Sequence, residues 1–360
     1  TLWFHQHLNA FRPNSAWARR DLAELSIPTF QLLGPQEHAY ERLQLAEVDG
    51  VAVRPVYPGA PDSTVMGLPL RRPLRPGESV TVLLDWEARL ATVARRQGRR
   101  GRHHDFAHWY PRIAVVDEGG WQVNPLVRSG EFYGEFASWD VTLEVAEDQV
   151  IGATGVPVEG DPGWTRAAVT GRGPVSLQRM AYGAPAPDPL GLLAGEPAPG
   201  RKRVRWRAEQ VHHFAWSTSP DYRYEGGEWE GVAIHVLYQP GDTAWDDGVV
   251  VERSRTVLAW YSELFGERYP YPQFTNLHRI ESGGTEFPML VMNGSPSLGL
   301  IAHEAAHQWA HAILANNEWR EAWLDEGMAS FLNQWFMEAH GRPADWGKSL
   351  DQLAQGPERD

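Results

Sequence analysis

Hydrophobic and polar residues alternate along roughly the first 215 residues, and clusters of Gly, Pro and Asp interrupt the alternation. A period of two predicts half-buried strands, because successive side chains of a strand point to opposite faces. The predicted strands cover 52–57, 79–90, 112–117, 138–145, 149–155, 165–171, 174–182 and 203–216. Short strands at this spacing are typical of a sandwich or a large open antiparallel sheet.

The pattern changes near residue 218. One further strand is predicted at 231–238, and from Asp246 to Phe265 the apolar residues recur at helical spacing. We therefore expect a multidomain chain, with an all-β N-terminal sandwich or saddle domain over residues 1–218 and an α+β domain over residues 219–360.

The stretch GLIAHEAAHQWAHAIL contains His303, Glu304 and His307 in the pattern H-E-x-x-H, and Glu326 follows after eighteen further residues. Residues four apart on a helix share a face about 5.4 Å apart, so both imidazoles can ligate one ion. Two histidines and one carboxylate are a known ligand set for a single Zn²⁺ with an open position. We predict that His303, His307 and Glu326 bind zinc and that Glu304 is the general base for an attacking water molecule.

The flanking residues support a helix at this point. Ser295 is predicted to be the N-cap and Pro296 to lie in the first helical turn, and Ile301, Ala305 and Trp309 form an apolar stripe at helical spacing. The alternative is a surface helix that carries a coincidental pair of histidines.

These motifs resemble those of a known family. HEAAHQW and WLDEG are similar to the H-E-x-x-H, eighteen residues, E pattern of the gluzincin metallopeptidases, specifically of the aminopeptidase N-like family. GGTEFP at 283–288 is similar to a G-G-x-E-F-P variant of the family's exopeptidase motif, and the resemblance extends over about residues 7–340. It implies that the second domain is a thermolysin-like catalytic domain.

The resemblance also implies roles for residues of the GGTEFP segment. Glu286 would bind the free α-amino group of a peptide substrate, and the backbone of Gly283 and Gly284 would lie along the peptide. An α-amino group is largely protonated near pH 7, so a carboxylate at the end of a cleft suits this role. The alternative is a Gly-rich turn in which Glu286 is solvated.

The chain also departs from the family pattern. The family carries a tyrosine beyond the third ligand that hydrogen-bonds the oxyanion of the intermediate, and no tyrosine follows Glu326 here. We expect a fragment that is truncated at both ends, with an incomplete catalytic domain. Loss of one oxyanion donor typically costs about 10²–10³ in rate. HQWAHAI also replaces the family's common HQWFGN.

Composition limits the possible partners. A formal net charge of −13 argues against binding to nucleic acid, and the basic stretches at 71–76, 94–102 and 201–207 are expected to be solvated loops or strands with an outward charged side. There is no run of eighteen apolar residues and no cysteine. The expected partners are peptides with a free N-terminus. The family resemblance favours an extracytoplasmic location, periplasmic or secreted.

The other histidines are less suited by their spacing to bind a metal ion. His103, His104 and His108 lie near Asp105 but lack helical ligand spacing. His212 and His213, as neighbours in a predicted strand, are expected to point to opposite faces and to make ordinary hydrogen bonds.

Three functions remain open from the sequence. The first is a zinc aminopeptidase. The second is a zinc hydrolase of other specificity, an endopeptidase or an epoxide hydrolase. The third is a catalytically silent scaffold on the same fold.

Overall fold

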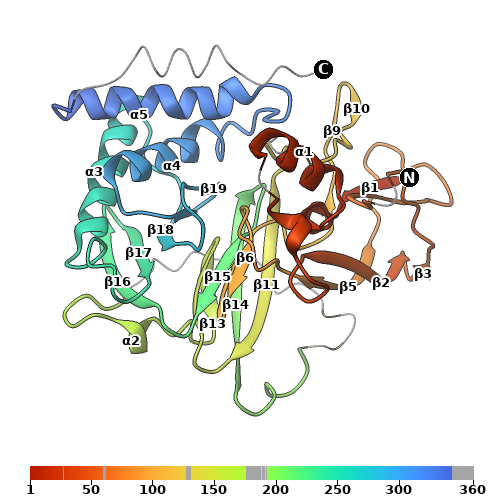
Figure 1. Ribbon diagram of the computed structural model, residues 1–360, viewed down its shortest axis with the longest axis horizontal. Helices are drawn as coiled ribbons and strands as arrows, with labels where there is room; N and C mark the ends of the chain where they lie inside the picture. Colours follow the sequence, from red (N-terminus) through yellow and green to blue (C-terminus); the bar gives the residue numbers. More distant parts are fainter. Residues whose placement is uncertain are drawn as a thin grey trace. The chain divides into compact units, whose positions relative to one another are not determined.

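The computed structural model describes residues 1–26, 28–59, 62–126, 131–175, 188, 191 and 193–342. Packing divides the chain into two compact units, whose elements are labelled in Figure 1. The first comprises described residues of 1–100, 104–135 and 317–320, and the second those of 101–103, 136–316 and 321–360. The boundary at residue 218 stays a prediction.

The first unit is built mainly from short strands. Its sheets have the strand orders β4-β1-β8, β3-β2-β5 and β10-β9. Its elements are β1 (Leu2–His5), η1 (His7–Phe11), α1 (Ala16–Leu25), η2 (Phe30–Leu32), β2 (Tyr40–Val48), β3 (Val51–Ala52), β4 (Val65–Leu68), β5 (Val82–Arg89), β6 (Gly98–Arg100), β8 (Arg112–Ile113), β9 (Val116–Asp117) and β10 (Gly120–Trp121). The first residue of strand β7 (His103–Phe106) is assigned to the second unit, and its other residues are assigned to the first.

The second unit begins with antiparallel strands. Strand β14 (Arg201–Val211) lies between β11 (Ala137–Ala146) and β13 (Val156–Glu159), and β12 (Val150–Ala153) pairs with β15 (Trp216–Ser219).

The basic residues of β14 are paired across this sheet. Arg205 lies 2.7 Å from Asp140 and Arg203 lies 2.9 Å from Glu144, both on β11. Val204 and Trp206, the apolar residues that alternate with these arginines, are buried. The alternation expected of a strand with one charged face is therefore present.

A mixed five-stranded sheet follows in the order β16-β17-β18-β20-β19. Strands β17, β18 and β20 run parallel, whereas β16 and β19 pair antiparallel with their neighbours. The elements are β16 (Arg223–Trp229), β17 (Val232–Tyr238), α3 (Val249–Phe265), β18 (Gln273–His278), β19 (Glu286–Phe287), β20 (Leu290–Asn293), α4 (Leu298–Ala310), η3 (Trp323–Gly327) and α5 (Met328–Ala339). Helix α4 packs against α3, α5 and the β19–β20 edge of the sheet (Figure 1).

The β-rich first part and the helices of the last part agree with the prediction, but some strands do not. Residues 165–171 are not a strand: α2 (Trp164–Ala167) is a helical turn, and the indole N–H of Trp164 donates to the carbonyl of Ile151 at 2.8 Å. Burial of that large ring determines the local structure more than the polar–apolar alternation does. The strand predicted at 174–182 falls mostly outside the described residues.

Where the structure describes the chain, it contains no helix that is both long enough and apolar enough to cross a membrane.

Candidate metal centre

Helix α4 carries the H-E-x-x-H pattern and is held firmly in the second unit. The hydroxyl of Ser297 accepts the N–H of Leu300 at 3.3 Å, so Ser297 caps the helix. The predicted cap at Ser295 is therefore wrong, because Pro296 and Ser297 still precede the first helical turn. Ile301, Ala305 and Trp309 are buried as the apolar stripe predicts.

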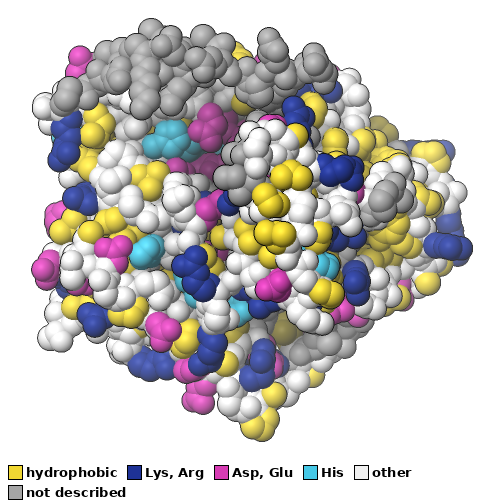
Figure 2. Space-filling model, viewed as in Figure 1, with side chains coloured by type: hydrophobic (Ala, Val, Ile, Leu, Met, Phe, Trp, Pro, Cys, Tyr) yellow, Lys and Arg dark blue, Asp and Glu magenta, His cyan; other side chains and the backbone are white. Residues whose placement is uncertain are grey.

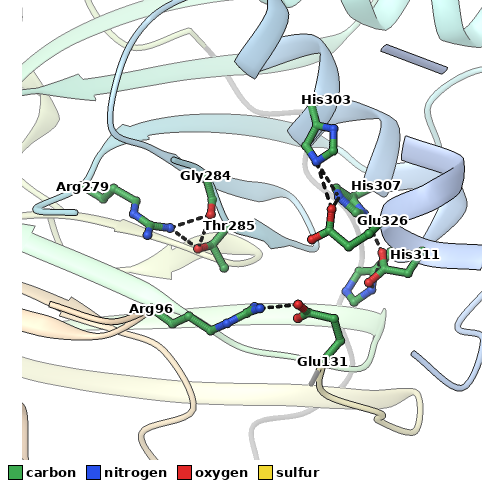
Figure 3. Close-up of polar contacts among 10 residues, drawn as sticks. Arg96, Glu131, Arg279, Gly284, Thr285, His303, His307, His311 and Glu326 are labelled. Atoms are coloured by element: carbon green, nitrogen blue, oxygen red, sulfur yellow. Dashed lines mark hydrogen bonds and ion pairs between the residues drawn. The ribbon is translucent and has the colours of Figure 1, made fainter. Parts of the chain in front are cut away.

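Three predicted ligands converge on one point. Nε2 of His303 lies 3.4 Å from Nε2 of His307 and 3.2 Å from Oε2 of Glu326. Nε2 of His307 lies 3.8 Å from the same carboxylate oxygen. The close-up in Figure 3 shows both rings and the carboxylate directed toward one another. We call these three residues the HExxH site.

The triangle of donor atoms suits a small divalent cation. Zinc binds His nitrogen and carboxylate oxygen at about 2.0–2.2 Å, so the ligand atoms of a tetrahedral site lie about 3.4 Å apart. The observed separations of 3.2, 3.4 and 3.8 Å bracket that value. The side chain of Glu326 is 46% exposed, which leaves one side of the HExxH site accessible to a ligand.

Glu326 reaches the HExxH site from an irregular turn. It belongs to the π-helical segment η3, which runs directly into α5. Figure 2 shows acidic side chains beside a histidine on the face where Figure 1 places α4.

Asp325, the neighbour of Glu326, contacts the ring of His307 on the side away from the other ligands. Its Oδ1 lies 2.6 Å from Nδ1 of His307, and both side chains are fully buried. A proton on Nδ1 of His307 can be donated to this carboxylate, which leaves Nε2 free to face the other ligands.

The carboxylates give the HExxH site a negative field. Burial by itself lowers the pKa of His303, but the hydrogen bond to Glu326 and the charge of Glu304 outweigh it and raise that pKa. Burial likewise lowers the pKa of His307, but the charge and hydrogen bond of Asp325, together with the charges of Glu326 and Glu286, raise it well above its usual value. A field that favours protonated imidazoles also favours a divalent cation between them.

Glu304 lies next to the two histidines, and its carboxylate lies against Gly284. Burial raises the pKa of its carboxyl group to about 7, although the charges of His303 and His307 lower it. The backbone of Gly284 packs directly against this side chain: a Cβ at Gly284 would lie 2.0 Å from Oε1 of Glu304. Only glycine fits at this position without displacing the carboxylate.

Glu286 lies on β19, the edge strand of the five-stranded sheet. Its side chain is buried, so the alternative of a solvated turn is wrong. Gln308 joins this strand to α4, because its amide donates to the carbonyl of Phe287 at 3.1 Å and accepts the N–H of Met289 at 2.8 Å. Helix α4 therefore positions the edge strand as well as the HExxH ligands.

Arg279 holds the glycine segment, and the sequence offered no motif that would identify it. Its guanidinium donates to the carbonyl of Gly284 at 2.7 Å and to the hydroxyl of Thr285 (Figure 3). It also lies 2.6 Å from Glu281. Gly283 adopts a φ of +78°, a conformation that favours glycine.

The structure does not place His103, His104 and His108 in a metal site. Nε2 of His103 lies 2.8 Å from the hydroxyl of Tyr222, and Nδ1 lies 3.2 Å from the amide of Gln239. Within the described ranges, no group of three or more potential ligands contains any of the three histidines.

Comparisons with known proteins bear on this region. Residues 293–359 match the Peptidase family M1 domain. The chain is similar to aminopeptidase N from Acetobacter pasteurianus, with 26% identity over 131 residues that cover 31% of this chain and 37% of that protein. It is also similar to human (Homo sapiens) endoplasmic reticulum aminopeptidase 1, with 28% identity over 120 residues that cover 28% of this chain and 13% of that protein. The chain therefore spans well under half the length of these relatives.

Solved structures extend the similarity to most of the chain. The crystal structure of the M1 zinc metallopeptidase from Deinococcus radiodurans matches with a TM-score of 0.57 and 18% identity, covering 89% of this chain and 66% of that one. A mutant of that protein bound to a Tyr-Ser-Ala substrate matches with a TM-score of 0.58, 18% identity and the same coverage. At this level of identity the match shows a shared fold.

Proposed function

Because the chain belongs to the aminopeptidase N-like family of gluzincin metallopeptidases, we propose that it is a zinc aminopeptidase, which removes N-terminal residues from peptides. The convergence of His303, His307 and Glu326 on one point is the observation that carries this proposal. The part of the chain after residue 218 then corresponds to the thermolysin-like catalytic domain.

The HExxH site holds one zinc ion in this proposal. When bound, zinc supplies Lewis-acid chemistry, polarising a carbonyl and lowering the pKa of a water molecule. Asp325 keeps the ring of His307 oriented through Nδ1, and the exposed side of Glu326 leaves room for a substrate.

Glu304 moves the proton in the reaction. Its carboxylate takes a proton from the attacking water as the new C–O bond forms, and it delivers that proton to the amine that leaves when the peptide C–N bond breaks. Burial raises the pKa of this carboxyl group, which favours its holding the proton between the two steps.

Glu286 and the glycine segment set the position of the peptide. The edge strand β19 offers backbone groups for an extended substrate, and the carboxylate of Glu286 pairs with the protonated α-amino group. Arg279 supports this geometry by fixing the carbonyl of Gly284. The Tyr-Ser-Ala complex of the Deinococcus protein is a precedent for a short peptide ligand on this fold.

Paired substrates test the proposal. The purified chain is assayed for zinc content and for hydrolysis of a peptide with a free α-amino group against its N-acetylated form. We expect one ion at the HExxH site and cleavage of the free-amine peptide alone. Equal rates on both peptides would favour an endopeptidase, and the absence of zinc from the HExxH site would favour a silent scaffold. A zinc hydrolase of another class, such as an epoxide hydrolase, would leave both peptides intact while retaining the ion.

We further propose an extracytoplasmic location, periplasmic or secreted, on the basis of the family alone. Fractionation of cells that express the full open reading frame tests this, and recovery only in the cytosol would contradict it.

A further inference from the structure

A second group of histidines lies outside the HExxH site. His212 and His213 follow directly after Val211, the last residue of β14, and His311 follows the last residue of α4. Each of the three offers a ring nitrogen, and these nitrogens lie within 4.8 Å of one another. We call this group the three-histidine cluster.

The expectation that His212 and His213 point to opposite faces is wrong. Successive residues point to opposite faces only within a strand, and the chain bends at His212. The bend brings both rings to the same place. The ring centroids of His212 and His213 are 4.6 Å apart, with the rings nearly perpendicular.

The third ring completes a compact arrangement. His311 meets His212 edge to face, with centroids 4.6 Å apart, and lies parallel to His213 at 5.8 Å. All three side chains are buried, with exposed fractions of 1% for His212 and 3% for the other two. Transfer of three imidazoles from water into a protein interior is costly, and apolar side chains would fill the same space at lower cost.

We propose that the three-histidine cluster is a second metal site, which binds one divalent transition-metal ion of the zinc, copper or nickel class. Three histidines are a known zinc ligand set, and neutral imidazole suits these metals, whereas Mg²⁺ and Ca²⁺ prefer oxygen ligands. With nitrogens no more than 4.8 Å apart, the centre of the triangle lies within about 2.8 Å of each, so every ring needs to shift by less than about 1 Å to reach a bonding distance of about 2.0–2.1 Å.

The two sites are linked through Asp325. Its Oδ1 lies 2.6 Å from Nδ1 of His307 and 3.7 Å from Nδ1 of His311. The buried carboxylate of Asp325 therefore lies between a histidine of the cluster and a histidine of the HExxH site. None of the three cluster residues holds zinc in the proposed function, so either site can fail without the other.

Metal counting in variants separates the two sites. The untagged chain is saturated with Zn²⁺, freed of excess ion and analysed by mass spectrometry for zinc per chain. We expect two ions in the wild type. The double variant His303→Gln, Glu326→Gln should keep one ion, and the further change His213→Phe, which preserves an aromatic ring, should remove it. His340→Gln, at an exposed position, is the matched control and should leave the count unchanged.

A second measurement does not depend on the buried substitution. Cu²⁺ added to the His303→Gln, Glu326→Gln variant should give an electron paramagnetic resonance spectrum with coupling to nitrogen ligands, and Zn²⁺ should raise its Tm. A folded double variant that binds neither ion overturns the second site, and leaves the proposed function intact if the wild type still holds one zinc. If instead the wild type holds a single ion and the double variant retains it, the cluster is supported and the HExxH site loses its metal. A wild type without zinc contradicts both.

Discussion

The HExxH site and the three-histidine cluster lie in the same unit and differ in what surrounds their imidazoles. The two imidazoles of the HExxH site lie among three carboxylates, those of Glu304, Asp325 and Glu326, and Glu326 is half exposed. The proposed ligands of the cluster are imidazoles alone and all are buried, although Oδ1 of Asp325 lies 3.7 Å from Nδ1 of His311. The carboxylates raise the pKa of the HExxH histidines and create a field that attracts a cation. The exposure of Glu326 leaves one side of the site open to solvent.

Similar ligands suit different purposes according to their surroundings. A site with an open side and a buried carboxylate of pKa about 7 can bind a substrate and move a proton. A closed group of buried imidazoles can hold an ion but leaves no open side for a substrate.

Loss of one HExxH ligand should separate the two regions most strongly. His307→Ala removes a ligand from the HExxH site and leaves the buried Asp325 without its partner. Because Lewis-acid activation is worth several kcal/mol, we expect peptide hydrolysis to fall by at least about 10³-fold. Rate assays and zinc analysis check this. Hydrolysis within tenfold of the wild type would break the contrast, since the catalytic metal would then lie elsewhere.

Glu304→Gln should separate metal binding from chemistry. The amide keeps the shape beside Gly284 but cannot take up a proton, so kcat should fall by about 10²–10⁴-fold while zinc content stays constant. Steady-state kinetics and metal analysis measure both quantities. A variant that loses zinc in parallel with activity would assign Glu304 to ion binding instead.

Glu286→Gln tests the carboxylate on the edge strand. Loss of a charge-assisted hydrogen bond worth about 1.5–3 kcal/mol should lower kcat/KM for free-amine peptides by about 10–100-fold. Any residual cleavage of N-acetylated peptides should not change. Glu338→Gln, at an exposed position of α5, is the control. An equal loss on both kinds of substrate would contradict recognition of the amino group.

Asp325→Asn sharpens the comparison, because Asp325 lies between the two groups of histidines. Removal of its charge should weaken zinc binding at the HExxH site by about 10–100-fold, since partners behind a metal ligand typically contribute that much. Competition with a chromophoric chelator measures the affinity. An unchanged affinity would mean that His307 keeps its orientation without this carboxylate.

His235 shows what burial does to a histidine that belongs to neither group. It stacks on Trp164 and lies 2.6 Å from the hydroxyl of Tyr224, and burial lowers its pKa to about 3. Above pH 6.5 the ring is neutral in both the folded and unfolded states. Below that pH the imidazole binds a proton in the unfolded chain but not in the folded chain. The free energy of unfolding therefore falls as the pH drops toward 3.

His235→Phe should remove part of this acid sensitivity, by at most about 1.4 kcal/mol per pH unit. Urea unfolding at pH 7 and pH 5 measures the difference in the free energy of unfolding. The change in slope with pH, rather than the absolute stability, is the informative quantity, because the variant also loses the contact with Tyr224. An unchanged slope would mean that the pKa of His235 is the same in the folded and unfolded chains.

Local patterns in the sequence were enough to predict the helix of the HExxH site and the roles suggested for its residues. His303, Glu304 and His307 lie within two turns of one helix, and their relative directions follow from helical periodicity alone. The β-rich first part was predictable for the same reason, because alternation over a few residues reports on burial of one face. A large buried ring such as Trp164 overrode that signal where tertiary packing required a turn.

The sequence by itself therefore determined which residue types meet on one helix and indicated Glu326 as the third ligand, and the family resemblance extended this to Glu286. Tertiary structure alone decided that Arg279 holds the carbonyl of Gly284 and that His311 meets two histidines about a hundred residues earlier in the chain. Such contacts depend on where a strand bends and how a helix packs on a sheet. Those features arise from the packing of the whole unit, and no local periodicity records them.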